Sequence, residues 1–194
     1  MRIIAGKFKG RRLKTPKTDV IRPTIDRVKE SVFSILQNQI TNAKFLDLCA
    51  GSGSIGLEAI SRGAESVTFV DQHSGAIQLI RFNLNLCGLD AKIHRIQLRR
   101  STAQKAIKAL GYKSESYDLI YFDPPYDSGI YEGCLQLISD NQLLNRSGLI
   151  CVECRQTNEK IVEMLQLGVG DFQPYNQKCY GETTLFFYKL ENKS

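Results

Sequence analysis

The tetrapeptide Asp123-Pro124-Pro125-Tyr126 is the segment of this sequence best suited to chemistry, and it directly follows an apolar run. Two consecutive prolines stiffen the backbone and remove two N–H donors, which leaves carbonyl oxygens beside the carboxylate of Asp123 as unclaimed acceptors. Such a group of acceptors suits an N–H₂ group, and the ring of Tyr126 offers a flat surface on which a base can stack. We therefore predict a site for the exocyclic amine of an unpaired or flipped nucleobase, with Asp123, Pro124 and Tyr126 as its catalytic residues.

Methylation of that amine is the reaction that these residues favour. The amine is a weak nucleophile because its lone pair is delocalised into the ring, and acceptors on both N–H bonds favour the pyramidal geometry that frees the lone pair. Catalysis of this kind depends mainly on alignment and desolvation. From the reference pKa of about 3.9 for aspartate, we expect Asp123 to be ionised at neutral pH. Whether Asp123 takes the proton or only orients the amine stays open at this point.

A second motif, Gly51-Ser52-Gly53-Ser54-Ile55-Gly56, has the spacing G-x-G-x-x-G and lies between an apolar run and a helical pattern. Glycine allows a tight turn and a close approach of the backbone to a ligand. Asp71 follows Gly51 by 20 residues, at the end of the next apolar run, where a carboxylate can bind both ribose hydroxyls of an adenosine. NAD and S-adenosylmethionine both fit this spacing. The tetrapeptide favours S-adenosylmethionine, and so does Asp47, which is similar to the acid that meets the methionine end of the cofactor in methyltransferases. The predicted cofactor-binding residues are Asp47, Gly51, Ser52, Gly53, Asp71 and Asp123.

Positive charge is concentrated in the first thirty residues. They contain ten of the 26 Lys and Arg residues but only three of the 20 Asp and Glu residues, in a chain of net charge +6. A basic segment beside a nearly neutral remainder is typical of a protein that binds phosphate groups. The alternative is a solvated tail, but Ile3, Ile4, Phe8 and Leu13 interrupt the charges and favour an ordered hairpin. We predict that the nucleic acid contacts Lys7, Lys9, Arg11, Arg12, Arg22 and Arg27.

The rest of the chain must position these motifs, and its hydrophobic pattern alternates between short apolar strands and amphipathic helices. We expect strands at 44–49, 66–71, 92–98, 117–122, 149–154, 172–176 and 183–190. We expect helices from 24 onward, around 57–60, and at 77–84, 102–110, 131–139 and 158–167. This order predicts an α/β, Rossmann-like fold with a mostly parallel sheet and helices on both faces. We expect residues 1–23 to form a small β-hairpin and a linker, and residues 24–194 to form the catalytic domain.

The six cysteines include a C-x-x-C pair, Cys151 and Cys154, which could indicate a zinc or redox site. The pair falls within an apolar strand, where residues three apart point to opposite faces, so we expect buried free thiols and no metal. No apolar run reaches the roughly 20 residues that cross a bilayer. We therefore expect a cytoplasmic protein without a membrane partner or an obligate protein partner.

The sequence resembles the RsmD family, the bacterial 16S ribosomal RNA guanine-N2 methyltransferases, over nearly its whole length. The resemblance is carried by MRIIAGKFKGRRL at the start, RPTIDRVKESVF (22–33), DLCAGSGSIGLEAISRGA (47–64), DPPY (123–126) and YGETTL (180–185). It implies a seven-stranded class I methyltransferase fold, S-adenosylmethionine as donor, and the N2 amine of a guanine in 16S rRNA of the small ribosomal subunit as acceptor. Arg22, Thr24 and Arg27 match the family's N-terminal signature, where they could close over the cofactor, grip RNA or anchor a helix.

One segment departs from the family pattern. The family has an acid near the adenine amine after its third strand, whereas residues 97–102 (QLRRST) contain none. Ser101 or a backbone group could take that place, and Arg99 and Arg100 could extend the basic surface or end a solvated strand.

Three other functions remain compatible with these motifs. The same tetrapeptide serves N6-adenine methylation of DNA or RNA and glutamine methylation of proteins, although the basic segment disfavours a protein substrate. An NAD-dependent oxidoreductase would use the glycine motif but leave the tetrapeptide unexplained. A non-catalytic ribosome assembly factor could keep the fold, although the intact Asp123 and Tyr126 argue against it.

Overall fold

The computed structural model describes residues 1–15, 23–91, 94–126 and 128–191. Its helices are α1 (Pro23–Leu36), α2 (Ser54–Ser61), α3 (Ser74–Leu86), α4 (Ala103–Tyr112), α5 (Tyr131–Asp140) and α6 (Glu159–Leu167). Its strands are β1 (Lys44–Leu48), β2 (Ser66–Asp71), β3 (Ile96–Arg100), β4 (Tyr117–Phe122), β5 (Leu144–Arg155), β6 (Phe172–Tyr180) and β7 (Thr183–Leu190).

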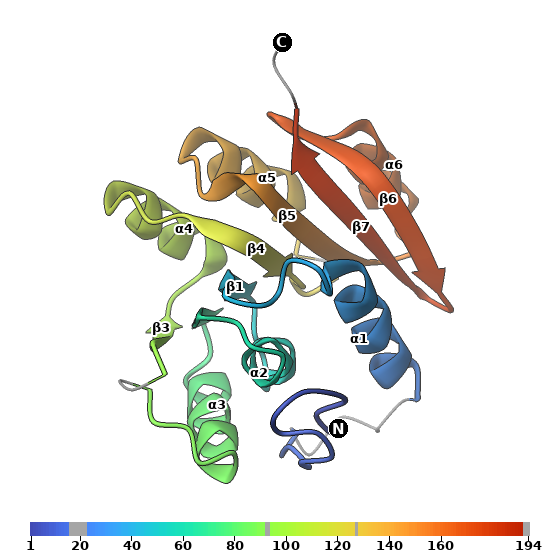
Figure 1. The fold of residues 1–194 in the computed structure, drawn as a ribbon. Coiled ribbons are helices and arrows are strands. Elements are labelled where there is room, and N and C mark those ends of the chain that lie inside the picture. Colours follow the sequence, from blue (N-terminus) through green and yellow to red (C-terminus); the bar gives the residue numbers. More distant parts are fainter. Residues whose placement is uncertain (16–22, 92–93, 127, 192–194) are drawn as a thin grey trace.

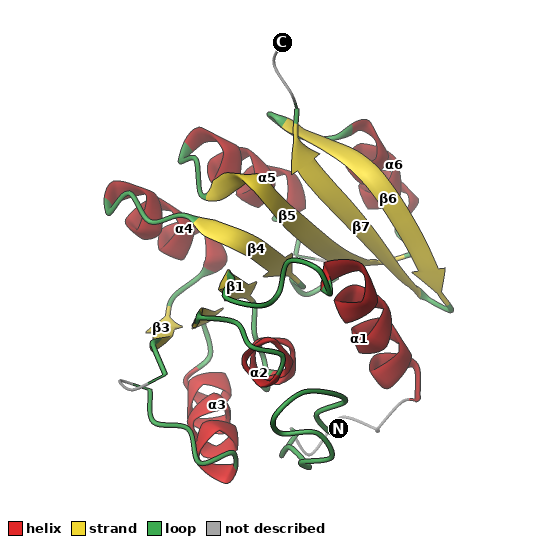
Figure 2. Ribbon diagram, in the orientation of Figure 1, coloured by secondary structure: helices red, strands yellow, loops and turns green. Residues whose placement is uncertain are grey.

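The seven strands form one sheet in the order β3-β2-β1-β4-β5-β7-β6 (Figure 1). The first five positions of this order pair in parallel, and β7 pairs antiparallel with both β5 and β6. Helices cover both faces of the sheet, as the colouring by secondary structure in Figure 2 shows. The predicted α/β, mostly parallel architecture is therefore confirmed.

Alternation along the central strands divides the core into two apolar layers. On β4, Leu119 and Tyr121 pack with residues of α1, α2 and α3, whereas Ile120 and Phe122 pack with residues of α4, α5 and α6. Parallel strands covered on both faces are apolar throughout for this reason, and their ends at the sheet edge are left for polar groups. Among the described residues, no helix is long and apolar enough to cross a membrane.

Four predicted strands have different bounds. The first was expected at 44–49 and ends at Leu48, and the sixth was expected at 172–176 and continues to Tyr180. The third strand was expected at 92–98 and runs from Ile96 to Arg100. Residues 92–93 lie outside the described residues, and Arg95, just before the strand, has a left-handed backbone (φ 50°) that is not compatible with an extended strand. Arg99, expected beyond the strand, lies within it and pairs with Glu115 at 3.8 Å. The fifth strand was expected at 149–154 but begins at Leu144, with a register shift opposite Tyr117 and Leu119.

The basic N-terminal segment, for which we predicted a small β-hairpin, doubles back on itself through an antiparallel bridge between Arg2 and Arg12. The N–H of Ile3 donates to the carbonyl of Arg11 at 3.0 Å, and the N–H of Leu13 donates to the carbonyl of Met1 at 3.0 Å. Its backbone is held by the buried carboxylate of Glu58 on α2, which accepts hydrogen bonds from the N–H groups of Ile4 (2.7 Å) and Ala5 (2.9 Å). The same carboxylate pairs with Lys29 of α1 at 3.7 Å, and Lys29 donates to the carbonyl of Arg2 at 2.5 Å. These contacts fix the N-terminal segment to α1 and α2.

Candidate active site

The loop between β1 and α2 folds tightly because three of its residues have left-handed backbones: Cys49 (φ 63°), Gly51 (φ 54°) and Gly53 (φ 75°). Gly56, at the start of α2, serves close packing, since a Cβ there would overlap the ring of Phe69 on β2. Gly51 differs: no described heavy atom lies within 4 Å of the place where its Cβ would stand. The open space over Gly51 lets a ligand approach the backbone there.

Two buried acids hold this loop from neighbouring strands. Asp47 of β1 accepts a hydrogen bond from the N–H of Gly56, and Asp71 of β2 accepts one from the N–H of Gly51, both at 2.9 Å. The other carboxylate oxygen of Asp71 accepts from the N–H of His73 at 2.8 Å. Burial raises the pKa of Asp47 to about 7, although the bond from Gly56 opposes that rise. Asp47 thus lies behind the loop, whereas Asp71 also faces the adjoining pocket.

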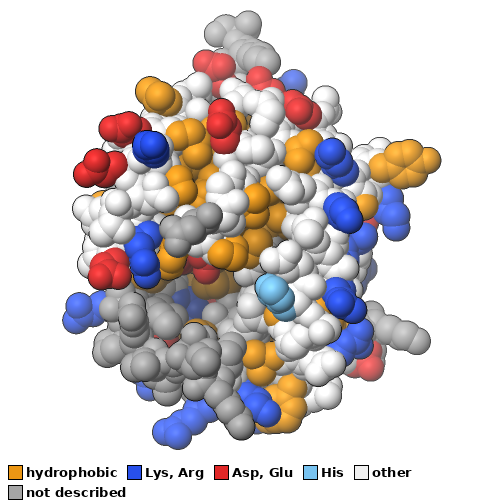
Figure 3. All heavy atoms as spheres, turned by 180° about the vertical axis from the view of Figure 1, so that it is seen from behind, with side chains coloured by type: hydrophobic (Ala, Val, Ile, Leu, Met, Phe, Trp, Pro, Cys, Tyr) orange, Lys and Arg blue, Asp and Glu red, His pale blue; other side chains and the backbone are white. Residues whose placement is uncertain are grey.

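A pocket of about 420 Å³ opens at the carboxyl ends of β1, β2, β3 and β4, where ligands of parallel sheets bind. Figure 3 shows a hollow on the face turned away from the view of Figure 1, with hydrophobic side chains around it. The described residues that line the pocket are Cys49, Val70, Asp71, Gln72, His73, Ser101, Thr102, Ala103, Gln104, Asp123, Pro124, Pro125, Tyr126, Ser128 and Ile130.

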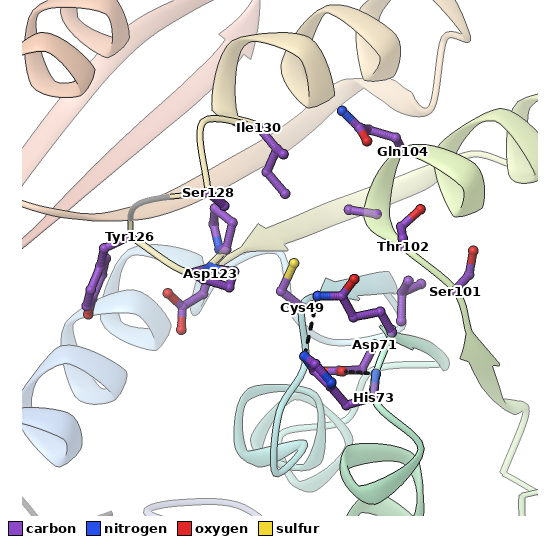
Figure 4. A pocket seen from close by; sticks show the side chains of 15 residues that line it. Cys49, Asp71, His73, Ser101, Thr102, Gln104, Asp123, Tyr126, Ser128 and Ile130 are labelled. Atoms are coloured by element: carbon purple, nitrogen blue, oxygen red, sulfur yellow. Dashed lines mark hydrogen bonds between the residues drawn. The ribbon is translucent and has the colours of Figure 1, made fainter.

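The pocket has two chemically distinct ends, both of which are visible in Figure 4. Asp123 and Tyr126 stand at one end, and the carboxylate of Asp123 points to the side of Tyr126. Ser101, Thr102 and Gln104 lie at the other end, beyond Asp71. Hydroxyl and amide groups thus occupy the region where the sequence lacks the family's acid.

The predicted catalytic residues lie in one loop, and their electrostatics differ from the expectation. Burial raises the pKa of Asp123 well above its usual range, and the nearby charges of Glu153 and Asp47 raise it further. A reference value for a solvated aspartate therefore does not describe this carboxyl group. The carbonyl of Pro125, which was expected to be unclaimed, accepts a hydrogen bond from the N–H of Ser128 at 2.9 Å.

Glu153 of β5 is a site residue that the sequence reasoning missed. It accepts hydrogen bonds from the hydroxyl of Tyr121 and, at 3.5 Å, from the hydroxyl of Tyr126. Burial raises its pKa, while these two hydrogen bonds oppose the rise. The guanidinium of Arg155 lies 4.9 Å from the ring centre of Tyr126, so Tyr126 is held both at its hydroxyl and on its ring. The available signal was an acid inside an otherwise apolar strand, between Cys151 and Cys154.

The predicted cofactor and RNA residues fall into three places. Asp71 and Asp123 line the pocket, whereas the backbone of 51–53 lies beside it, tied to Asp71 through Gly51. Ser52 contacts the N-terminal segment, its hydroxyl 4.0 Å from the sulfur of Met1. Arg22 lies outside the described residues, and the remaining predicted RNA residues are exposed on the N-terminal segment or on α1: Lys7, Lys9, Arg11, Arg12 and Arg27.

The two cysteines of the C-x-x-C pair lie on opposite faces of the sheet. Cys151 and Cys154 are buried free thiols in opposite apolar layers, as predicted. Over the described ranges, no group of three or more His, Cys, Asp or Glu residues could hold a metal ion.

The sequence matches a protein-family model described as "Conserved hypothetical protein 95" over residues 1–189. Ribosomal RNA small subunit methyltransferase D of Escherichia coli (strain K12) is 36% identical over 192 residues, which cover 98% of this chain and 90% of that protein. The solved structure of yhhF from Escherichia coli, described as a methyltransferase, is 30% identical with a TM-score of 0.81 and covers 98% of both chains. A hypothetical protein of Thermus thermophilus shares the fold, with 23% identity, a TM-score of 0.80, and coverage of 98% of this chain and 99% of that one.

Proposed function

Because the chain belongs to the RsmD family, we propose that it methylates small-subunit ribosomal RNA, with S-adenosylmethionine as donor and the N2 amine of a guanine as acceptor. The observation that carries this proposal is that Asp123 and Tyr126 line the same pocket as Asp71. A cofactor held at Asp71 and a base stacked on Tyr126 would therefore meet in one pocket. The substrate in this proposal is 16S rRNA within the small ribosomal subunit.

The pocket residues fit an adenosine-containing cofactor. Each oxygen of Asp71 accepts one backbone N–H, and a carboxylate oxygen keeps capacity for a second bond, so ribose hydroxyls can be bound there. The space over Gly51 admits the chain that joins ribose to the reactive centre. Ser101, Thr102 and Gln104 offer hydrogen-bonding groups for the adenine. The volume of about 420 Å³ is in the range of small-molecule sites.

When bound, the cofactor supplies an electrophilic methyl group, and the residues of this chain prepare the acceptor. Tyr126 stacks the guanine, and its own position is fixed by Glu153 and Arg155. The carboxylate of Asp123 accepts one N–H of the amine, and the Pro124 carbonyl serves as the second acceptor. After transfer the nitrogen carries a positive charge, and its excess proton passes to Asp123. The raised pKa of Asp123 supports this role, because it makes the carboxylate a stronger base than that of a solvated aspartate.

Transfer of a labelled methyl group from S-adenosylmethionine tests the proposal. The acceptor substrate is small ribosomal subunits from a strain that lacks this enzyme. After the reaction, the RNA is digested and its methylated nucleosides are identified. We expect N2-methylguanosine with the wild type and at least a roughly hundredfold slower transfer with Asp123→Ala, because the amine loses its acceptor. Both proteins should still bind S-adenosylhomocysteine in calorimetry, because Asp71 and its hydrogen bond to Gly51 are unchanged.

Other products of this assay would lead elsewhere. Methyl label on adenine would show that the acceptor is the N6 amine of adenine and not the N2 amine of guanine, and the proposed mechanism would still apply. No label from a protein that binds S-adenosylhomocysteine would favour the non-catalytic assembly factor. Transfer by Asp123→Ala at the wild-type rate would remove Asp123 from the mechanism.

A further inference from the structure

A second hollow, of about 360 Å³, meets the cofactor pocket at Tyr126. It lies where β5 ends and α6 begins, and we call it the β5–α6 groove. The described residues that line it are Tyr126, Arg155, Thr157, Asn158, Glu159 and Lys160. Tyr126 lines both hollows, so it forms a wall between them.

The sheet topology places the β5–α6 groove on the acceptor side of the site. Strand β5 runs parallel to β4, with Phe122 paired to Val152, so both strands end at the same edge. The predicted cofactor-binding residues lie on the other side of β4 in the sheet. Gly51 follows β1, and Asp71 is the last residue of β2. A base that stacks on Tyr126 must connect to its neighbours in the RNA, and the groove begins at that residue.

The lining of the β5–α6 groove suits a nucleotide. Arg155 and Lys160 bring two positive charges, while Glu159 brings one negative charge. The guanidinium of Arg155 lies on the ring of Tyr126, a placement in which its edge N–H groups can still bind phosphate oxygens. Asn158 caps α6 by accepting from the N–H of Ile161 at 3.4 Å, which fixes the backbone around Lys160. Lys160 itself is exposed.

We propose that the β5–α6 groove binds the nucleotide next to the target base, with Arg155 and Lys160 contacting its phosphate. This inference rests on the proposed function for the identity of the target base. It adds a binding site that is separate from the basic N-terminal segment. Arg155 then has two tasks, since it holds Tyr126 on one side and the RNA backbone on the other.

The test measures binding of a fluorescein-labelled single-stranded RNA of about 12 nucleotides at several KCl concentrations. One phosphate contact on a single strand adds about 0.7 to the slope of log affinity against log salt, which corresponds to about fivefold in affinity at 0.1 M salt. We expect Lys160→Ala to bind this RNA about fivefold more weakly at 0.1 M salt and to have a salt slope smaller in magnitude by about 0.7. Glu159→Gln should bind more tightly than the wild type, because it removes the opposing charge.

Two further variants separate the tasks of Arg155 and control for charge. Arg155→Lys should keep the salt slope but lower kcat, because a lysine does not hold the Tyr126 ring in the same plane. Lys108→Ala, an exposed lysine on α4, is the matched control and should bind RNA as the wild type does. Binding of S-adenosylhomocysteine should be unchanged in every variant, which shows that each one is folded.

Equal affinity and equal salt slope for Lys160→Ala and Lys108→Ala would overturn the inference. Failure of the proposed function looks different. In that case the wild type would transfer no methyl group to small subunits. Lys160→Ala would still bind RNA more weakly, and with a smaller salt slope, than its control Lys108→Ala.

Discussion

Asp123 shows how far a single side chain can depart from its ordinary behaviour. Burial is the largest cause of its raised pKa, followed by the charges of Glu153 and Asp47. The protonated form cannot accept the amine proton, so the reaction needs the ionised form. Activity should therefore rise with pH through a midpoint above the usual range of an aspartate.

Replacing Glu153 by glutamine should move that midpoint. Glu153→Gln removes the nearby negative charge, so the pKa of Asp123 should fall and the single-turnover rate constant should reach half of its maximum at a lower pH. The measurement is single-turnover methyl transfer across the pH range, with S-adenosylhomocysteine binding followed in parallel. The control is Glu182→Gln, an exposed acid in the turn between β6 and β7. An unmoved midpoint in Glu153→Gln would mean that Glu153 does not influence the ionisation of Asp123.

The sequence could indicate Asp123, Tyr126 and Asp71, because each follows directly from a motif at the end of an apolar run. It could not indicate Glu153, whose partners become neighbours only through the pairing of β4 with β5. Within its own strand Glu153 stands between buried cysteines, and nothing local distinguishes a site acid from a tolerated one. The raised pKa of Asp123 was unpredictable for the same reason, since it arises from tertiary burial.

At the scale of helices and strands, type and order followed from hydrophobic periodicity, whereas some boundaries did not. The additional first residues of β5 include Asn145, whose side chain donates to Asp118 at 2.7 Å, a contact between segments distant in sequence. The start of β3 depends on the left-handed backbone of Arg95, a residue type without a preference for that conformation. Both features are consequences of the assembled sheet.

The packing of α2 on β2 gives a prediction for its glycine. Gly56→Ala should lower the free energy of unfolding by about 1–3 kcal/mol, because the added methyl group overlaps the ring of Phe69. Gly133→Ala on α5 is the matched control, since only the side chain of Gln104 lies within 4 Å of its Cβ position. That exposed helix position should become more stable by about 0.5–1 kcal/mol. Urea unfolding of both variants gives the two values, and equal signs would contradict this account of α2.

For the whole molecule, charge and fold are arranged so that the basic N-terminal segment adjoins the cofactor loop. The N–H of Lys14 donates to the side chain of Asn83 at 2.8 Å, and the amide of Asn83 donates to the carbonyl of Ser52 at 2.9 Å. Asn83 thus links the segment to the glycine loop. In Figure 3, Lys and Arg side chains lie mainly toward the edges of the face that carries the hollow.

Replacing Lys7, Lys9, Arg11 and Arg12 together by alanine should weaken RNA binding and flatten its salt dependence. Each phosphate contact that is lost should lower the slope by about 0.7–0.9, depending on whether the RNA is single- or double-stranded at that point. The readout is binding to small ribosomal subunits over a range of KCl concentrations. The double variant Lys105→Ala, Lys108→Ala on α4 serves as the control. A slope equal to that of the wild type would mean that the N-terminal charges are only solvated.

The central pair of strands also bears on how the molecule folds. Phe45 of β1 pairs with Leu119 of β4, so the middle of the sheet joins parts of the chain that are far apart in sequence. Closing so long a loop is entropically costly. The pocket lies across this junction, with Cys49 after β1 and Asp123 after β4. A chain folded only in its first half would have the glycine loop but no pocket, so a ligand of this site binds and stabilises only the fully folded protein.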